Sequence, residues 1–178
     1  MVAKISLLKR MKILVLAFVS GALLLAAGCK PKAKQIPAIQ RKEAANLVSE
    51  AQFAVTLRDY ARAEPLFEKA ANLCPDTGDY WVDLGVVRRR LDNKSGAKAA
   101  YKEALGAFRD AAELDPNQSD AMLQEINVLL LLGRVDEARD ALQQARKKLP
   151  DDRALRNFDE GRQLERILAD PAFKEIAL

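Results

Sequence analysis

Few residues in this chain are of types that could do chemistry. It contains two cysteines and no histidine, which excludes Ser–His and Cys–His nucleophile pairs and the usual zinc ligand sets. Its eight glycines form no phosphate-binding loop. The adjacent carboxylates of Asp151 and Asp152 precede a helical pattern, where an N-cap role explains them. We therefore expect no enzyme, no metal site and no cofactor.

The remaining chemistry belongs to the thiol of Cys29. Residues 13–27 before it are apolar or small, and the leader ahead of them carries basic residues and no acidic ones. These 15 residues are fewer than the roughly 20 that a helix needs to cross a bilayer, but they suit the core of a secretory signal. We expect residues 1–28 to be a signal peptide. An uncleaved anchor and an ordinary secretory signal are the alternatives.

The sequence LLAAGC, which ends at Cys29, resembles the lipobox of bacterial lipoproteins. One position departs from the common pattern, because Ala26 stands where leucine is usual. The resemblance implies that Cys29 is the lipid attachment site and that the protein is lipid-anchored in the bacterial cell envelope. Lys30 is not the aspartate that often retains lipoproteins in the inner membrane. In a Gram-negative organism, this implies the outer membrane, facing the periplasm.

Charge is unevenly distributed along the chain. Four of the 29 basic residues and none of the 25 acidic residues precede Cys29, so residues 29–178 are neutral overall. Five positive charges cluster within residues 30–42, which leaves the rest mildly acidic and argues against a nucleic-acid partner. Residues 29–42 also contain two prolines and no apolar periodicity. We expect a flexible basic tether there, either drawn to anionic headgroups or simply solvated.

A pattern of small, aromatic and proline residues occurs three times beyond this tether. It has the form A-x3-F-x2-A-x4-P, with leucine in place of phenylalanine in the third copy, and its prolines are 41 and then 34 residues apart. Small residues let two helices approach closely, and the larger residue fills the space one turn on. The copies are Ala63, Phe67, Ala70 and Pro75; Ala104, Phe108, Ala111 and Pro116; and Ala138, Leu142, Ala145 and Pro150.

These copies resemble tetratricopeptide repeats, a family of 34-residue helix–turn–helix units. Trp81, Leu84 and Gly85 also match the W-x2-L-G of the family's first helix. The resemblance implies an all-α fold, a TPR-type α-solenoid of about three repeats closed by C-terminal capping helices. The predicted boundaries are 43–150 for the TPR domain, 44–77, 78–118 and 119–152 for its repeats, and 153–178 for the capping helices.

Two features depart from the family's pattern. The second repeat is seven residues too long, and seven residues are close to two helical turns, so an insertion within 93–106 can lengthen its second helix. Ala97, Tyr101 and Ala104 imitate the pattern seven residues early, and that helix could pack with either triplet. Pro65 lies inside the second helix of the first repeat and removes one backbone hydrogen bond, but we still expect the helix.

Residues 153–169 are helical in pattern and are predicted to cap the stack, with a degenerate fourth repeat as the alternative. Asp170 and Pro171 fit the N-cap and first position of a short last helix through 176. If Cys29 is acylated, Cys74 has no partner for a disulfide, and we expect it to be a packed structural cysteine.

Arrays of these repeats generally bind proteins, and their first helices line a groove. The resemblance places a mostly apolar groove in this chain, with a basic corner as the candidate contact for a partner's carboxylates. A favourable charge at a helix C-terminus is the alternative explanation of that corner. The groove positions are Val48, Ser49, Gln52, Val82, Val86, Arg89, Arg90, Leu123, Asn127, Leu130 and Leu131.

The function that the resemblance implies is a membrane-anchored scaffold that binds a protein or peptide partner in this groove. It resembles the pilot and accessory lipoproteins of envelope assembly. A generic periplasmic adaptor, or a spacer with no dedicated partner, is the alternative. The expected contacts are therefore with a protein or peptide and, through Cys29, with the membrane. The partner's identity, the pathway and the oligomeric state stay open.

Overall fold

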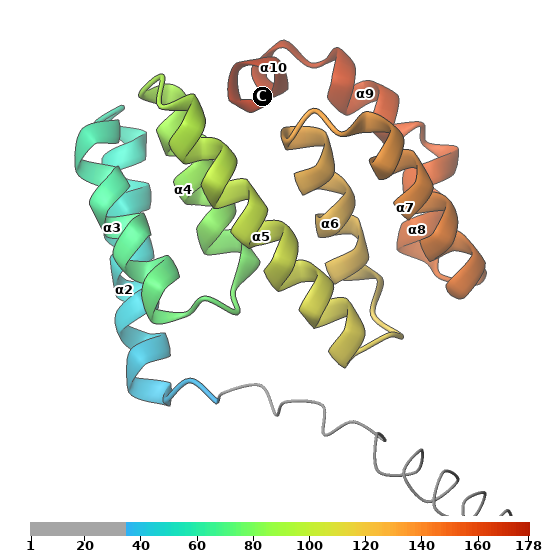
Figure 1. The fold of residues 1–178 in the computed structure, drawn as a ribbon, viewed down its shortest axis with the longest axis horizontal. Coiled ribbons are helices and arrows are strands. Elements are labelled where there is room, and N and C mark those ends of the chain that lie inside the picture. Colours follow the sequence, from blue (N-terminus) through green and yellow to red (C-terminus); the bar gives the residue numbers. More distant parts are fainter. Residues whose placement is uncertain (1–34) are drawn as a thin grey trace, which may run out of the picture. The chain divides into compact units, whose positions relative to one another are not determined.

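In the computed structural model, which describes residues 35–178, every regular element is a helix (Figure 1). None of the helices in this range is long and apolar enough to span a membrane. The predicted signal peptide, Cys29 and residues 30–34 of the predicted tether lie outside the described residues. The helices are α2 (Ala38–Thr56), α3 (Tyr60–Leu73), α4 (Gly78–Arg90), α5 (Lys94–Leu114), α6 (Ser119–Leu131), α7 (Val135–Lys148), α8 (Arg153–Glu160), α9 (Gln163–Ala169) and α10 (Pro171–Ile176).

The first six of these helices form three pairs, and each helix packs on the next one along the chain (Figure 1). The loop inside each pair has three residues, and its middle residue has a positive φ. These middle residues are Arg58, Asp92 and Gly133. The equal loops repeat the same helix–turn–helix unit, so the predicted all-α solenoid of three repeats is confirmed.

The start of the fold differs from the prediction at one boundary. Helix α2 begins at Ala38, directly after Pro37, whereas the tether was predicted to extend to residue 42. Pro37 lacks an N–H and has an extended backbone, which suits the position before a first helical turn. Residues 38–42 are therefore helical.

The second helices of the three repeats are in a common register. Ala63, Ala97 and Ala138 each occupy the fourth position of their helix and are fully buried. The larger side chains of Phe67, Tyr101 and Leu142 follow one turn later and are also buried. Of the two triplets that the sequence offered in repeat two, the structure therefore places the one that begins at Ala97 in the repeat position.

The predicted lengthening of the second helix is confirmed, because α5 has 21 residues and α3 and α7 have 14 each. Its predicted place within 93–106 is wrong. The Asn93 side chain accepts a hydrogen bond from the Gly96 N–H at 2.9 Å, which fixes the start of α5 and its register. The seven additional residues are therefore 108–114. They carry Phe108, which is buried and whose ring packs against Gly78. A Cβ on Gly78 would lie only 2.6 Å from this ring.

Two other expectations about the repeats are confirmed. Helix α3 continues through Pro65. Cys74 is a free, fully buried cysteine at the end of α3, and burial raises the pKa of its thiol. A buried thiol held in its neutral form is inert, as a structural cysteine should be.

The C-terminal residues form two capping helices where one was predicted over 153–169. Helices α8 and α9 are separated at Gly161 and Arg162, and Arg162 has a φ of 51°. Leu155 and Leu164 are nine residues apart, which is two and a half turns, so a straight helix would place them on opposite faces. The break allows both leucines to be buried in the core.

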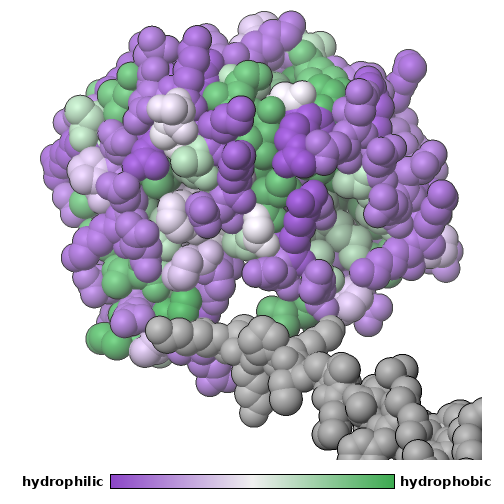
Figure 2. All heavy atoms as spheres, viewed as in Figure 1, coloured by the Kyte–Doolittle hydropathy of each residue, from purple (hydrophilic) through white to green (hydrophobic). Residues whose placement is uncertain are grey.

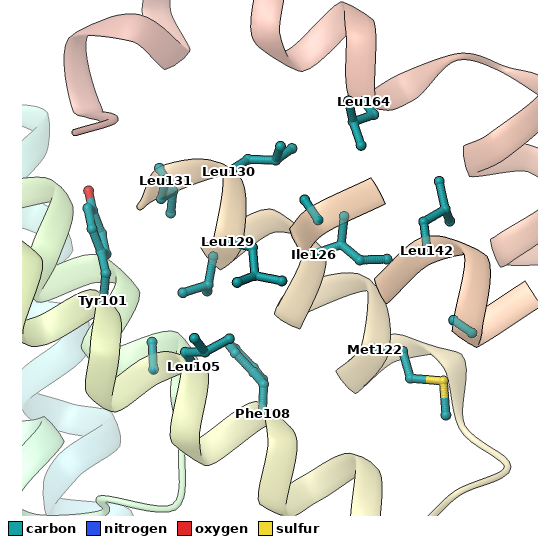
Figure 3. Packing of buried hydrophobic residues seen from close by; sticks show 14 of the residues in the cluster. Tyr101, Leu105, Phe108, Met122, Ile126, Leu129, Leu130, Leu131, Leu142 and Leu164 are labelled. Carbon is teal, nitrogen blue, oxygen red and sulfur yellow. The ribbon is translucent and has the colours of Figure 1, made fainter. Parts of the chain in front are cut away.

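Helix α10 begins as predicted. The Asp170 side chain accepts a hydrogen bond from the Ala172 N–H at 2.8 Å, and Pro171 occupies the first turn. Figure 3 shows the core that these capping helices close: Leu105 of α5, Ile126 and Leu129 of α6, and Leu164 of α9 point into one cluster. The largest cluster of buried residues therefore joins repeats two and three to the C-terminal helices.

Candidate functional site

The residues predicted to line a groove lie on α2, α4 and α6, the first helices of the three repeats. Val48, Val82 and Leu123 are at equivalent repeat positions, and each is half-buried with its base packed on the core. Gln52, Val86 and Asn127 follow one turn later, and Gln52 is exposed, as is Ser49. These residues keep part of their surface open, which a binding face requires. In the view of Figure 2, hydrophobic residues are exposed in separate patches among hydrophilic side chains.

A cleft of about 340 Å³ lies between the first turns of α4 and α6. Phe108 and Ala111 of the α5 extension line it, as do the exposed residues Asp79 and Asp120. Asp76 lines it too, but its carboxylate is paired with Arg41 at 2.6 Å. Sequence reasoning missed this cleft, because it exists only when the extra turns lie at the end of α5. The lone signal was Gly78, whose missing side chain leaves room for the Phe108 ring.

Asp83 on α4 adds to the negative charge of this end. Its side chain is half-buried. Burial, together with the nearby negative charge of Asp79, raises the pKa of its carboxyl to about 6. The face therefore holds a carboxylate that is costly to ionise near neutral pH.

The opposite end of α4 is basic, and its three arginines have different partners. Arg88 bridges α4 to α3 through ion pairs with Glu64 at 2.9 Å and Glu68 at 2.6 Å, so it holds two helices together. Arg89 donates from Nε to the carbonyl of Ala177 at 2.9 Å. Arg90 forms an ion pair with Glu175. The predicted basic corner is therefore in contact with residues that follow α9.

Leu130 and Leu131 do not line an open groove, and that part of the prediction is wrong. They are 1% and 5% exposed. Figure 3 places them at the end of α6, with Leu164 of α9 beyond them, and the Leu131 carbonyl accepts a hydrogen bond from the Leu178 N–H at 2.9 Å. The capping helices cover the end of the first helix of repeat three as well as its second helix.

The face made by α2, α4 and α6 is thus apolar in its middle, acidic where α4 and α6 begin, and basic where α4 ends. Among residues 35–178, no group of three or more Cys, Asp or Glu side chains is placed to hold a metal ion. The chemistry that this arrangement supports is association, through apolar contact and charge complementarity.

Comparisons with known proteins give a consistent family. One tetratricopeptide repeat model matches residues 48–112, and a second matches residues 97–158. No curated protein sequence matches the chain.

Several solved structures are similar in fold. The TPR2B domain of yeast Sti1, in its pHsp70 complex, is 17% identical, with 76% of this chain and 96% of that chain covered and a TM-score of 0.43. The first TPR of Spaghetti (RPAP3), bound to the HSP90 peptide SRMEEVD, is 16% identical over 73% and 98% of the two chains, with a TM-score of 0.44. The Arabidopsis OM64 TPR domain is 14% identical over 71% and 98%, with a TM-score of 0.42.

Proposed function

Because the chain belongs to the tetratricopeptide repeat family, whose folds are protein-interaction scaffolds, we propose that it binds a protein or peptide partner on the face made by α2, α4 and α6. The observation that carries this proposal is the row of half-buried apolar side chains on successive first helices. The row consists of Val48, Val82, Val86 and Leu123. A partner that covers it removes apolar surface from water, which is the main favourable term in association.

The polar groups around this row define the partner's orientation. The cleft at the start of α4 and α6 favours basic side chains, because the exposed Asp79 and Asp120 line it. The partner's apolar residues would then follow the row toward the end of α4. An extended peptide or an amphipathic helix meets both requirements.

The test is recovery of partners from the native membranes with substitutions on this face. Leu123→Asp places a charge in the apolar row, and Asn127→Arg adds bulk at a polar position without altering the core. Each should lower partner recovery at least tenfold. The control is Ala99→Asp, which adds the same charge at an exposed position on α5 and should leave recovery unchanged.

Circular dichroism must give the same helicity for all variants. Unchanged recovery with both face variants would contradict the proposed binding face. An equal loss in the Ala99→Asp control would also contradict it, because the effect would then not depend on the face.

We also propose that this scaffold is anchored to a bacterial membrane through a lipid on Cys29 and serves envelope assembly, in the outer membrane if the organism is Gram-negative. The support is the sequence that ends at Cys29 and the basic segment that follows it. Recovery of a secretin or of a barrel-assembly component by the full chain would support this role. If no partner is enriched, the generic adaptor or spacer is the better description.

A further inference from the structure

The residues that follow α9 return to the end of α4 and occupy the basic end of the proposed binding face (Figure 1). Three hydrogen bonds hold their backbone. The Tyr101 hydroxyl donates to the Ile176 carbonyl at 2.8 Å, Arg89 donates to the Ala177 carbonyl at 2.9 Å, and the Leu178 N–H donates to the Leu131 carbonyl at 2.9 Å. The segment is thus bound as a peptide ligand would be, through its main chain.

The side chains of this segment add two further kinds of contact. Phe173 and Ile176, three residues apart on α10, pack as partly buried residues against the main core. Between them in the sequence, Glu175 forms an ion pair with Arg90. An apolar pair with a carboxylate beside it is therefore the pattern that this end of the face accepts.

The segment is also only partly buried in the described fold. Helix α10 has six residues, and none of them is fully buried. A helix of this length is not stable by itself, and elements with few buried contacts open at low cost. By contrast, the side chains it covers belong to the core, because Tyr101 and Leu131 are buried.

Release of the segment would leave unpaired groups behind. The Tyr101 hydroxyl, the Arg89 guanidinium and the Leu131 carbonyl would each lose a hydrogen-bond partner. Unpaired groups of this kind favour a replacement of similar chemistry. The neighbouring cleft is lined by Arg89, Lys94 and Lys98, so the site carries positive charge and complements an acidic replacement.

We propose that residues 171–178 are an intramolecular ligand, and that the partner displaces it with the acidic end of an amphipathic peptide. The other end of that peptide carries the basic side chains that suit the cleft at the start of α4 and α6. This inference rests on the proposed function and names the chemistry of its partner. The partner segment carries two apolar residues three apart with a carboxylate between them, as Phe173, Glu175 and Ile176 do. Because a tethered ligand acts at an effective concentration on the order of millimolar, it excludes weak binders and admits a better match.

The first measurement is hydrogen exchange on the full-length protein. The Leu178 amide should exchange at least 100-fold faster than the amides in the middle of α6, because release of α10 does not require unfolding of the repeats. Exchange of the two at the same rate would overturn the proposal, since α10 would then open only with the whole fold.

The second measurement uses a labelled, C-terminally amidated peptide with the sequence of residues 169–178. The full chain with Phe173→Asp and Ile176→Asp, whose own α10 no longer packs, should bind this peptide at least tenfold more tightly than the unaltered chain. The control is Ala172→Asp, an exposed position on the same helix, which should bind no better than the unaltered chain. A peptide carrying K174E should bind several-fold more tightly than the native sequence, and added salt should weaken it.

Arg89→Glu, added to the chain with Phe173→Asp and Ile176→Asp, should abolish peptide binding. If the chain with Phe173→Asp and Ile176→Asp is as helical as the unaltered one and binds neither the native peptide nor the K174E peptide, the proposal is wrong. The two proposals fail separately. If the face variants lose the partner but the Leu178 amide exchanges as slowly as the amides of α6, the binding face is supported and the intramolecular ligand is not. If the peptide binds but Leu123→Asp does not affect partner recovery, only the intramolecular ligand is supported.

Discussion

Asp83 is the residue whose charge conflicts most clearly with its surroundings. Its pKa is raised to about 6, so the folded protein binds a proton there more tightly than the unfolded chain does. This group therefore favours folding below about pH 4, and the benefit is lost as the pH rises through 6. Asp83→Asn should raise the free energy of unfolding by about 1–3 kcal/mol above pH 6 and by almost nothing below pH 4. Urea unfolding across this range measures it.

The matched control for this prediction is Asp120→Asn. Asp120 is also an acidic residue of a first helix, but it lies in the first turn of α6, where its charge interacts favourably with the helix N-terminus. Its removal should lower stability by about 0.3–1 kcal/mol at neutral pH. If Asp83→Asn is no more stable than the unaltered protein at pH 7.5, burial does not penalise the Asp83 carboxylate.

The sequence predicts single residues well where the repeat determines their helix face. Val82, Val86 and Leu123 lie half-buried on first helices, because the period fixes which side of the helix they occupy. Their role in binding stays a prediction. Leu130 and Leu131 were not, because their burial depends on residues 164–178, which follow no repeat. Contacts with a non-repeating segment leave no periodic signal in the sequence.

At the scale of elements, α4 and α5 approach each other through a glycine. A Cβ on Gly85 would overlap the buried Tyr101 ring. Gly85→Ala should therefore lower the free energy of unfolding by about 1–3 kcal/mol, as overpacking of a core does. Gly106→Ala is the matched control, because a Cβ there would meet no atom within 4 Å. It should raise stability by roughly 0.5–1 kcal/mol, the helix preference of alanine over glycine.

Thermal and urea unfolding of both alanine variants separates packing from helix propensity. If the free energy of unfolding changes equally and with the same sign in both variants, the close packing of α4 on α5 does not depend on Gly85. Binding by the Gly85→Ala variant is a second readout, because displacement of Tyr101 also disturbs the hydroxyl that holds Ile176.

The long helix α5 makes a separate prediction. Deletion of residues 108–114 should leave a 14-residue helix like α3 and α7, with Ala97 and Tyr101 still in register. The fold should remain helical. Stability should fall by about 3 kcal/mol, the cost of losing the buried Phe108 side chain. Circular dichroism and urea unfolding measure the two effects, and loss of helicity would show that the extension is required for folding.

The sequence predicted the length of α5 but not the place of its extra turns, and the reason is physical. A shift of seven residues along a helix returns to nearly the same face. The triplet that begins at Ala97 and the one that begins at Ala104 therefore offer a neighbouring helix equally suitable small and aromatic residues. The choice between them is made at Asn93, whose cap starts the helix. The break between α8 and α9 was also missed. The prediction assumed one apolar side over residues 153–169, whereas a straight helix cannot bury both Leu155 and Leu164.

The whole molecule joins a folded unit, Ile36–Leu178, to the N-terminal residues that carry the predicted lipid site. Each buried methylene contributes about 0.8 kcal/mol to membrane binding; one acyl chain is marginal, and two or more anchor a protein stably. Cys29→Ser should therefore move the protein from the membrane and detergent fractions to the aqueous fraction. Its circular dichroism should be unchanged, because the folded unit begins after Cys29.

Cys74→Ser is the matched control for this last prediction. It removes the other cysteine of the chain, which is buried in the repeats, and so it should leave the protein with the membrane. Its effect should instead be on stability, because it places a hydroxyl in an apolar site. A Cys29→Ser protein that stays with the membrane would indicate that residues 13–27 are retained as an anchor, and the scaffold would then be held by the chain itself and not by a lipid.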